Sequence, residues 1–242
     1  AKSLSIGLDV PLIEINHMQA HILSIFIESD QKPPNFPFLA LTVSGGHTQL
    51  VIVKDYFQME EIGRTLDDAA GEAFDKSGKV IGLDYPSGPI IDKLSKKGDP
   101  NAFKFTKPKV EGLNFSFSGL KTGFMNFIKK ESLANEDFIK NRLNDICASI
   151  QNTIIDILIE KIVSAVEITQ IKDIVICGGV SANSILRERI TDIGKDNKWK
   201  IYFPEIHYST DNAAMIGVVG YLKYKESIIS DLSCSATARY KI

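Results

Sequence analysis

FLALTVSGGHTQLVIV, residues 38–53, contains two apolar runs separated by a turn signal. The runs at residues 38–43 and 49–53 are rich in β-branched and aromatic residues, and the tetrapeptide SGGH lies between them. This pattern predicts two antiparallel strands joined by a hairpin turn. Because glycine accepts positive φ and lets a ligand approach the backbone, the turn is also a candidate anion-binding nest. Most Gly-Gly turns are only hairpins, so both interpretations stay open.

A second group of strand and helix patterns lies near the C-terminus. The uninterrupted apolar run DIVICGG, residues 173–179, predicts a strand buried on both faces. A helical pattern with Ser181 or Asn183 near its start follows, then the strand pattern KIYFP at residues 200–204 and a helical pattern at residues 209–224. This alternation of strand and helix predicts an α/β fold.

Helical patterns fill the stretch between the two groups of strands. A helix is expected over residues 67–82 with Asp67 or Asp68 as its N-cap, and a second helix over residues 89–97. A long amphipathic helix is expected over residues 136–168. The α/β fold therefore carries a helical insertion.

Composition is typical of a soluble globular protein. Apolar residues make up 44% of the 242 residues, and 28 Lys and Arg face 30 Asp and Glu, so the total charge does not indicate a nucleic-acid binder. No apolar run reaches the roughly 18 residues of a membrane helix, so no membrane partner is expected. The three cysteines are widely spaced, which favours a reducing, cytoplasmic setting.

The first residues predict the end of a helix, a Gly and Pro break, and then a strand. The chain does not open with Met. We therefore expect it to begin inside a larger protein.

Two histidines in EINHMQAHIL, residues 14–23, form half of a candidate metal site. His17 and His21 are four residues apart, so on a helix both rings face the same way and could bind one ion. Asn16 is a natural N-cap for that helix. The zinc peptidase pattern HExxH is absent because Met18 follows the first histidine.

This histidine spacing also arises by chance on ordinary helices, so a metal site needs a third ligand. The candidates are Asp211, at the start of the last helix, and His47 in the glycine turn. Asp211 has an alternative role, because it could instead cap that helix, as could Ser209 or Thr210.

A nucleotide site is indicated by the glycine pair Gly178 and Gly179. The pair joins a buried strand to a helix, where backbone donors and the helix dipole favour a phosphate. Neither the dinucleotide fingerprint nor a P-loop lysine is present. The acidic stretch DDAAGEAFDK, residues 67–76, either solvates a helix face or supplies carboxylates for ribose hydroxyls or magnesium.

Lysines and phenylalanines alternate between residues 93 and 130, the one local basic and aromatic footprint of the chain. Such a footprint is typical of RNA contact or of an exposed helical insertion with a solvated lysine surface. Its members are Lys93, Lys96, Lys97, Phe103, Lys104, Phe105, Lys107, Lys109, Phe115, Phe117, Lys121, Lys129 and Lys130.

Seven short motifs occur in order along the chain: NHMQAH, VSGGHTQL, DDAAGEAFDK, GLDYPSGP, NFSFSGLKT, CGGVSAN and STDNAAMIG. Together they closely resemble the TsaD family of tRNA threonylcarbamoyltransferases. The resemblance implies an actin and Hsp70-like (ASKHA, ribonuclease-H-like) lobe. It also implies transfer of threonylcarbamoyl from threonylcarbamoyl-AMP to N6 of the adenosine beside the anticodon, position 37, in tRNAs that read ANN codons.

The resemblance also implies the site residues. His17, His21 and Asp211 match the ligands of one divalent metal ion, iron or zinc, and His47 is a candidate general base. An adenine nucleotide, ATP or threonylcarbamoyl-AMP, would be the ligand. The residues that match positions around it are Thr42, Val43, Ser44, Gly45, Gly46, Asp75, Gly88, Asp92 and Asn183.

The same resemblance divides the chain and names its partners. Residues 1–36 would end an N-terminal lobe, residues 37–228 would form the C-terminal lobe with a helical insert at about 67–170, and residues 229–242 would be a returning tail. The missing part of the first lobe implies that this chain alone folds poorly or binds nucleotide without turnover. The partners would be tRNA, a TsaB-like paralogue and a TsaE-like ATPase.

The expected mechanism is positional and electrostatic. A metal ion would polarise the carbamoyl carbonyl, backbone donors would hold the phosphate, and the adenine amine would attack. Two alternatives remain: a non-catalytic nucleotide-binding module that serves protein partners, and a metallopeptidase, which the missing Glu after His17 disfavours.

Overall fold

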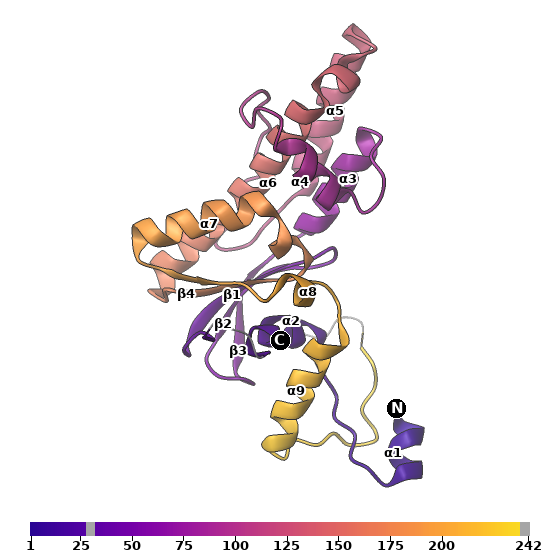
Figure 1. The fold of residues 1–242 in the computed structure, drawn as a ribbon, viewed down its shortest axis with the longest axis vertical. Coiled ribbons are helices and arrows are strands. Elements are labelled where there is room, and N and C mark those ends of the chain that lie inside the picture. Colours follow the sequence, from indigo (N-terminus) through magenta and orange to yellow (C-terminus); the bar gives the residue numbers. More distant parts are fainter. Residues whose placement is uncertain (28–31, 238–242) are drawn as a thin grey trace.

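A five-stranded sheet lies at the centre of the molecule, in a computed structural model that describes residues 1–27 and 32–237 (Figure 1). The strand order is β3-β2-β1-β4-β5. Strand β2 pairs antiparallel with β1 and β3, whereas β1 pairs parallel with β4, and β4 with β5. The strands are β1 (Phe38–Val43), β2 (Thr48–Val53), β3 (Met59–Arg64), β4 (Asp173–Cys177) and β5 (Lys200–Tyr202).

The predicted hairpin is confirmed, with Phe38 opposite Val53 and Val43 opposite Thr48. Strand β3 was not expected, because its sequence MEEIGR contains few apolar residues. It lies at the edge of the sheet, where Glu60 and Arg64 are exposed. Charged side chains are common on edge strands because they discourage pairing with another chain.

Helices cover both faces of the sheet (Figure 1). Strand β1 shows the division: Leu39 and Leu41 face the larger core, beneath the helical region, whereas Phe38 and Ala40 face a smaller core that contains Ile22. Burial on both faces explains why the strand is apolar throughout. The α/β class predicted from the sequence is confirmed.

The helices of the insertion and α7 lie on one face of the sheet and α2 lies on the other, and α5 and α6 extend furthest from the sheet (Figure 1). One group is α3 (Ala70–Val80), α4 (Ser87–Ser95), α5 (Ser118–Ala134), α6 (Phe138–Thr169), η2 (Gly179–Ala182) and α7 (Ser184–Asn197). The remaining helices are α1 (Lys2–Leu8), α2 (His17–Leu23), η1 (Ser24–Phe26), α8 (Ile206–Ser209) and α9 (Ala213–Lys225).

The predicted N-caps of α3 are wrong, because this helix begins at Ala70 without a side-chain cap. Asp67 instead accepts hydrogen bonds from the Phe117 N–H at 2.8 Å and the Ser118 N–H at 3.3 Å. It therefore caps α5, whose own N-cap residue supplies no side-chain bond.

Helix α4 begins at Ser87, two residues before the predicted start. The Asp75 carboxylate accepts a hydrogen bond from the Ser87 N–H at 2.8 Å, which satisfies a donor of the first turn. As in α5, the cap comes from a residue that is remote in sequence.

The predicted strand after Pro11 is wrong, because only Leu12 forms a bridge, to Ser230. Helix α1, which precedes it, buries none of its residues. Of the expected tail, residues 238–242 lie outside the described residues. None of the helices in the described ranges is long and apolar enough to cross a membrane.

The aromatic half of the expected RNA footprint is wrong, because its phenylalanines belong to the core. Phe115 and Phe117 are fully buried, and Phe103 and Phe105 pack against Phe127. Phe115 and Phe117 therefore cannot stack on a base at the surface, and the partly buried Phe103 and Phe105 pack against the core.

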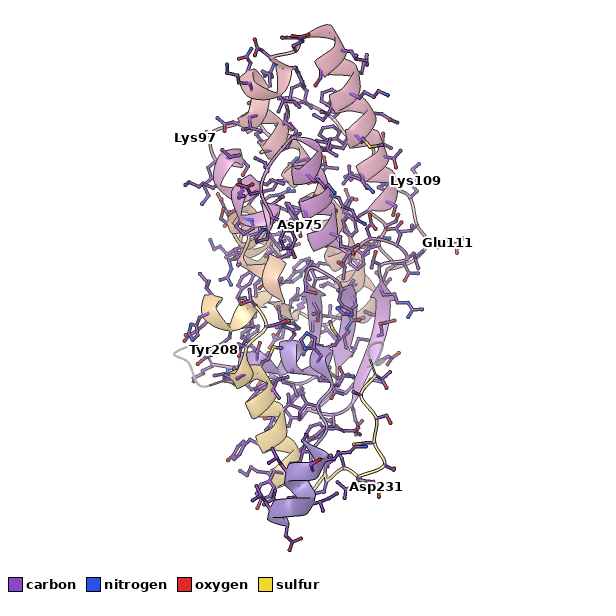
Figure 2. The ribbon with its side chains drawn as sticks, turned by 90° about the vertical axis from the view of Figure 1, so that its right-hand side faces the viewer. Asp75, Lys97, Lys109, Glu111, Tyr208 and Asp231 are labelled. Atoms are coloured by element: carbon purple, nitrogen blue, oxygen red, sulfur yellow. The ribbon has the colours of Figure 1, made fainter. Side chains whose placement is uncertain are left out.

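Three lysines of the same stretch can be placed in the structure. Lys97 and Lys109 lie on opposite sides of the helical region (Figure 2). Lys107 pairs with Glu160 on α6 and lies 3.7 Å from Asp156. These three lysines therefore do not share one surface.

Candidate metal and nucleotide site

Helix α2 carries both histidines of the candidate metal site. Its predicted N-cap is confirmed: Asn16 accepts hydrogen bonds from the Met18 N–H at 2.8 Å and the Gln19 N–H at 3.2 Å. The apolar side of the helix packs on the sheet, which takes His21 inside and leaves His17 at the surface. The two rings meet edge to face with centroids 4.8 Å apart.

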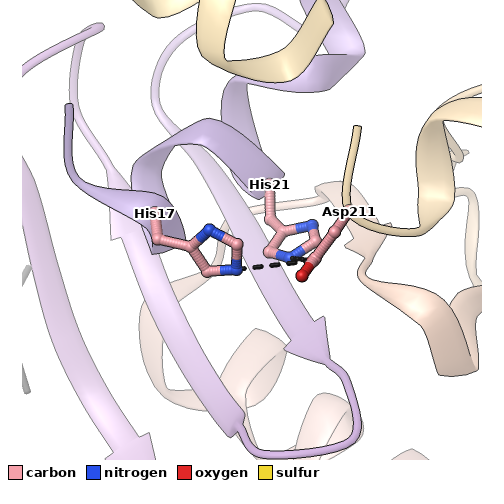
Figure 3. Close-up of side chains that lie close together, drawn as sticks. All are labelled: His17, His21 and Asp211. Atoms are coloured by element: carbon pink, nitrogen blue, oxygen red, sulfur yellow. Dashed lines mark ion pairs between the residues drawn. The ribbon is translucent and has the colours of Figure 1, made fainter. Parts of the chain in front are cut away.

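Asp211 reaches the histidines because it does not cap the helix that follows it. The N-cap of α9 is Asn212, whose side chain accepts a hydrogen bond from the Met215 N–H at 2.9 Å. The alternatives Ser209, Thr210 and Asp211 are therefore wrong as caps. The Asp211 side chain, in the loop before α9, points toward α2 (Figure 3).

The three side chains converge on one point (Figure 3). Asp211 Oδ1 lies 3.0 Å from His21 Nε2 and 3.4 Å from His17 Nε2. One ligand atom from each residue lies within 4.8 Å of the other two. Two imidazole nitrogens and a carboxylate suit zinc or iron, and three protein ligands leave coordination positions for a substrate.

The environment of His21 fits a metal ligand. His21 is 1% exposed; its Nδ1 has no hydrogen bond within the described residues, which is costly for a buried polar group, and its Nε2 faces the Asp211 carboxylate at 3.0 Å. Burial lowers the pKa of His21, repulsion from His17 lowers it further, and Asp211 opposes both. The ring is thus kept in the neutral form that binds metal.

The turn between β1 and β2 lies beside this triad. The Ser44 N–H donates to the His47 carbonyl at 2.8 Å, and the Ser44 hydroxyl accepts from the His47 N–H at 3.1 Å. Neither Gly45 nor Gly46 adopts the positive φ that glycine permits. Both glycines nevertheless face open space, so a ligand can approach their backbone.

The start of helix α3 packs directly on this turn. The Gly71 N–H donates to the Ser44 carbonyl at 3.2 Å, and the Ala70 N–H donates to the Thr48 hydroxyl at 2.9 Å. A Cβ at Gly71 would lie 2.5 Å from the Ser44 carbonyl oxygen. Only glycine therefore allows this close approach.

A cavity of about 350 Å³ opens between the turn, helices α3 and α4, and the start of α7. Five of the residues matched to the nucleotide line it: Gly45, Asp75, Gly88, Asp92 and Asn183. Three further residues of the seven motifs, which were not matched to the nucleotide, also line it: Phe74, Tyr85 and Thr210. Thr210 precedes Asp211, so the cavity and the metal triad adjoin along the chain.

Three polar residues of the cavity also cap helices. Asp75 binds the first turn of α4, as described above. The Asp92 carboxylate accepts from the Ser184 N–H at 3.3 Å and from the Ser184 hydroxyl at 2.9 Å. Asn183, one of the two residues expected near the start of α7, caps this helix by accepting from the Leu186 N–H at 3.0 Å. These capping bonds fix side chains that also border the cavity.

The other matched residues of the strand and turn do not line this cavity. Thr42 is fully buried on the α2 side of the sheet, where its hydroxyl lies 3.4 Å from the Cys177 sulfur. Val43 lies in the larger core. Ser44 and Gly46 remain in the turn, so any role for these four residues in ligand contact falls chiefly on their backbone.

His47 lies on the triad side of the turn. It lines a second cavity, of about 670 Å³, together with His17. Burial and repulsion from His17 lower the pKa of His47, and Asp211 opposes them. A neutral imidazole is therefore available here as a proton acceptor.

The sequence matches known proteins along its whole length. A family model described as TsaD, tRNA N6-adenosine threonylcarbamoyltransferase, matches residues 1–218. A tRNA N6-adenosine threonylcarbamoyltransferase of Christiangramia forsetii is 59% identical over 242 residues, which cover 100% of this chain and 71% of that relative. The enzyme of that name from Riemerella anatipestifer is 56% identical over 243 residues, with the same coverage.

Solved structures share the fold at low sequence identity. Full-length HypF in a phosphate- and nucleotide-bound form has a TM-score of 0.67 at 14% identity, over 94% of this chain and 46% of that protein. HypF from T. kodakarensis has a TM-score of 0.66 at 15% identity, over 93% and 39%. The predicted actin and Hsp70-like fold is confirmed.

Proposed function

This chain belongs to the TsaD family of tRNA N6-adenosine threonylcarbamoyltransferases, and from that premise we propose that its 350 Å³ cavity binds the adenylate of threonylcarbamoyl-AMP. The chain is a transferase that modifies tRNA. The proposed acceptor is N6 of the adenosine at position 37 in tRNAs that read ANN codons.

The residues around the cavity suit an adenine nucleotide. Asp75 and Asp92 offer carboxylates for ribose hydroxyls, and Gly88 leaves room for the sugar between them. At the other end, the open backbone of Gly45 and Gly46 can donate N–H groups to the phosphate. The nucleotide would thereby place its acyl phosphate beside the metal triad.

His17, His21 and Asp211 would hold one divalent ion, iron or zinc. When bound, such an ion supplies a Lewis acid for the carbamoyl carbonyl. The support is the burial of His21 and the single Asp211 carboxylate oxygen that lies between the two imidazole rings.

His47 is the proposed general base. A bond forms between the adenosine N6 and the carbamoyl carbon, the bond from that carbon to the phosphate oxygen breaks, and AMP leaves. The N6 nitrogen loses one proton, which the neutral His47 imidazole accepts.

The observation that carries this proposal is that the nucleotide cavity and the metal triad adjoin each other. Gly45 and Thr210 line the nucleotide cavity, whereas His47 and Asp211, one or two residues away, face the histidines. A ligand that binds in the cavity through its nucleotide would present its reactive carbonyl to the triad.

Mass spectrometry of tRNA nucleosides tests the proposal in cells whose only copy of the gene carries His17→Ala. Threonylcarbamoyladenosine should disappear, whereas His207→Ala, which changes an exposed histidine on α8, should leave it unchanged. Normal modification with His17→Ala would overturn the metal assignment. Loss of modification with both variants would show that the effect is not specific to the triad.

The metal content of the purified protein separates the alternatives. One equivalent of iron or zinc that is lost in Asp211→Asn is expected. Bound nucleotide with no metal would favour a non-catalytic binding module, and proteolysis that vanishes in His21→Ala would revive the peptidase.

We also propose a cytoplasmic setting with a TsaB-like paralogue and a TsaE-like ATPase as partners, which co-purification of the tagged protein would test.

A further inference from the structure

Gln151 is a buried amide on helix α6. Its side chain is 1% exposed, and Ile150 and Ile154 beside it are fully buried. A buried amide is costly unless both its ends form hydrogen bonds. Both do: Gln151 Nε2 donates to the Ser95 hydroxyl at 2.7 Å, and Gln151 Oε1 accepts from Asn183 Nδ2 at 2.7 Å.

These bonds belong to a closed ring that joins three helices. The Ser95 hydroxyl donates to the Asp92 carbonyl at 2.9 Å, and the Asp92 carboxylate accepts from the Ser184 hydroxyl at 2.9 Å. Ser184 follows Asn183 in the chain. The ring therefore runs through α4, α6 and the start of α7, and two of its members, Asp92 and Asn183, line the nucleotide cavity.

The ring determines which way each amide points. The Ser95 hydroxyl has one hydrogen, which it gives to the Asp92 carbonyl, so it can only accept from Gln151. The Gln151 oxygen must then face Asn183, and Asn183 must donate to it from its NH₂ group. The Asn183 oxygen meanwhile accepts from the Leu186 N–H, a bond that the flipped amide could not make.

We propose that Gln151 is a positioning residue for the nucleotide cavity, which fixes the Asn183 carboxamide so that the ligand meets an N–H donor. One Asn183 amide hydrogen goes to Gln151, and the second is left for the cavity. The preferred ligand atom is thus an acceptor, such as a purine ring nitrogen or a ribose oxygen. This inference deepens the proposed function and rests on it.

Calorimetric titration of the protein with ADP tests the inference. Gln151→Met keeps the volume and removes both hydrogen bonds, so ADP should bind about five- to tenfold more weakly. The matched control is Thr153→Val, because Thr153 is similarly buried on α6 but bonds only to the Ser149 carbonyl of its own helix. This variant should bind ADP like the unchanged protein.

A double-mutant cycle shows whether Gln151 acts through Asn183. In an Asn183→Ala background, Gln151→Met should weaken ADP binding no further, because the group it orients is gone. Ser95→Ala, a smaller change, should weaken ADP binding less than Gln151→Met. The inference would be overturned if the effects of Gln151→Met and Asn183→Ala on ADP affinity were additive, or if Gln151→Met alone left the affinity unaltered.

A second measurement separates this inference from the proposed function. If the unchanged protein fails to bind ADP, the proposed function is wrong at this cavity. The positioning role is then judged by NMR exchange of the Asn183 side-chain amide hydrogens. These should exchange slowly in the unchanged protein and faster in Gln151→Met, and equal rates would refute the role of Gln151.

Discussion

Asn212 caps helix α9, and the neighbouring Asp211 carboxylate lies 3.0 Å from His21 Nε2 instead. Either residue type can cap a helix or face a metal ion, but here Asn212 caps α9 and Asp211 faces the histidines. The cap holds the first turn of α9, and the position of that turn decides where the Asp211 side chain begins. A structural hydrogen bond therefore supports a candidate metal ligand.

Asn212→Ala should weaken both the helix and the metal site. Loss of the cap costs about 1 kcal/mol of unfolding free energy, and the frayed turn should lower zinc affinity severalfold. Asn212→Ser retains a capping oxygen and should preserve the helix, but it loses the amide that donates to the Thr210 carbonyl at 2.8 Å. Urea unfolding and zinc titration measure the two effects, and a destabilised Asn212→Ala variant with unchanged zinc affinity would contradict the link.

Asp67→Ala should destabilise the helical region by about 1 kcal/mol at neutral pH, because α5 loses its cap. Asp137→Ala is the control, since Asp137 occupies the N-cap position of α6 without a side-chain capping bond. Urea unfolding of both variants measures the difference. Equal destabilisation of the two would argue against capping by Asp67.

The effect of Asp67 should depend on pH. Burial raises the pKa of this carboxyl, but hydrogen bonds from Ser116, Phe117 and Ser118 outweigh it and place the pKa below its ordinary value of 3.8. The folded protein therefore binds this proton less tightly than the unfolded chain, and the stabilisation is complete only above that ordinary value. The difference in unfolding free energy between Asp67→Ala and the unchanged protein, measured by urea unfolding, should therefore become smaller as pH falls below about 4.

The outcome for Asp67 shows what a sequence can and cannot predict about this fold. The apolar runs of β1, β2 and β4 predict strands because burial on both faces needs apolar residues. The caps of α4 and α5 could not be predicted, because Asp75 and Asp67 come from other elements that only the folded chain brings near. Capping patterns in sequence assume a local donor and acceptor.

The same distinction applies to the candidate site. His17 and His21 share a helix, so their spacing alone predicts that they converge, and motif resemblance adds Asp211. Gln151 leaves no signal of this kind, because a single glutamine on the buried side of a helix matches no spacing rule. The prediction for Phe115 failed for the opposite reason. Its alternation with lysines is typical of an RNA-binding surface, but its ring is fully buried in the core.

Thiol labelling should distinguish the three cysteines. Burial raises the pKa of Cys147 and of Cys177 to about 12, so neither is a thiolate at pH 8. Cys234 is partly exposed. Iodoacetamide should therefore add one label to the folded protein and three after unfolding, as counted by mass spectrometry, and rapid labelling of Cys177 would contradict its burial in β4.

Gly71→Ala and Gly217→Ala should have effects of opposite sign. At Gly71 the new methyl would lie 2.5 Å from the Ser44 carbonyl oxygen and 2.7 Å from Gly45 Cα, and these backbone atoms cannot rotate away. We expect a loss of about 1–3 kcal/mol and weaker ADP binding as the turn is pushed into the cavity. At Gly217, inside α9, no atom beyond the helix's own nearby backbone lies within 4 Å of the added carbon, so alanine should stabilise the helix by up to about 1 kcal/mol. Urea unfolding and ADP titration of both variants check this pair, and a Gly71→Ala protein as stable as the original would show that α3 does not rest on the turn.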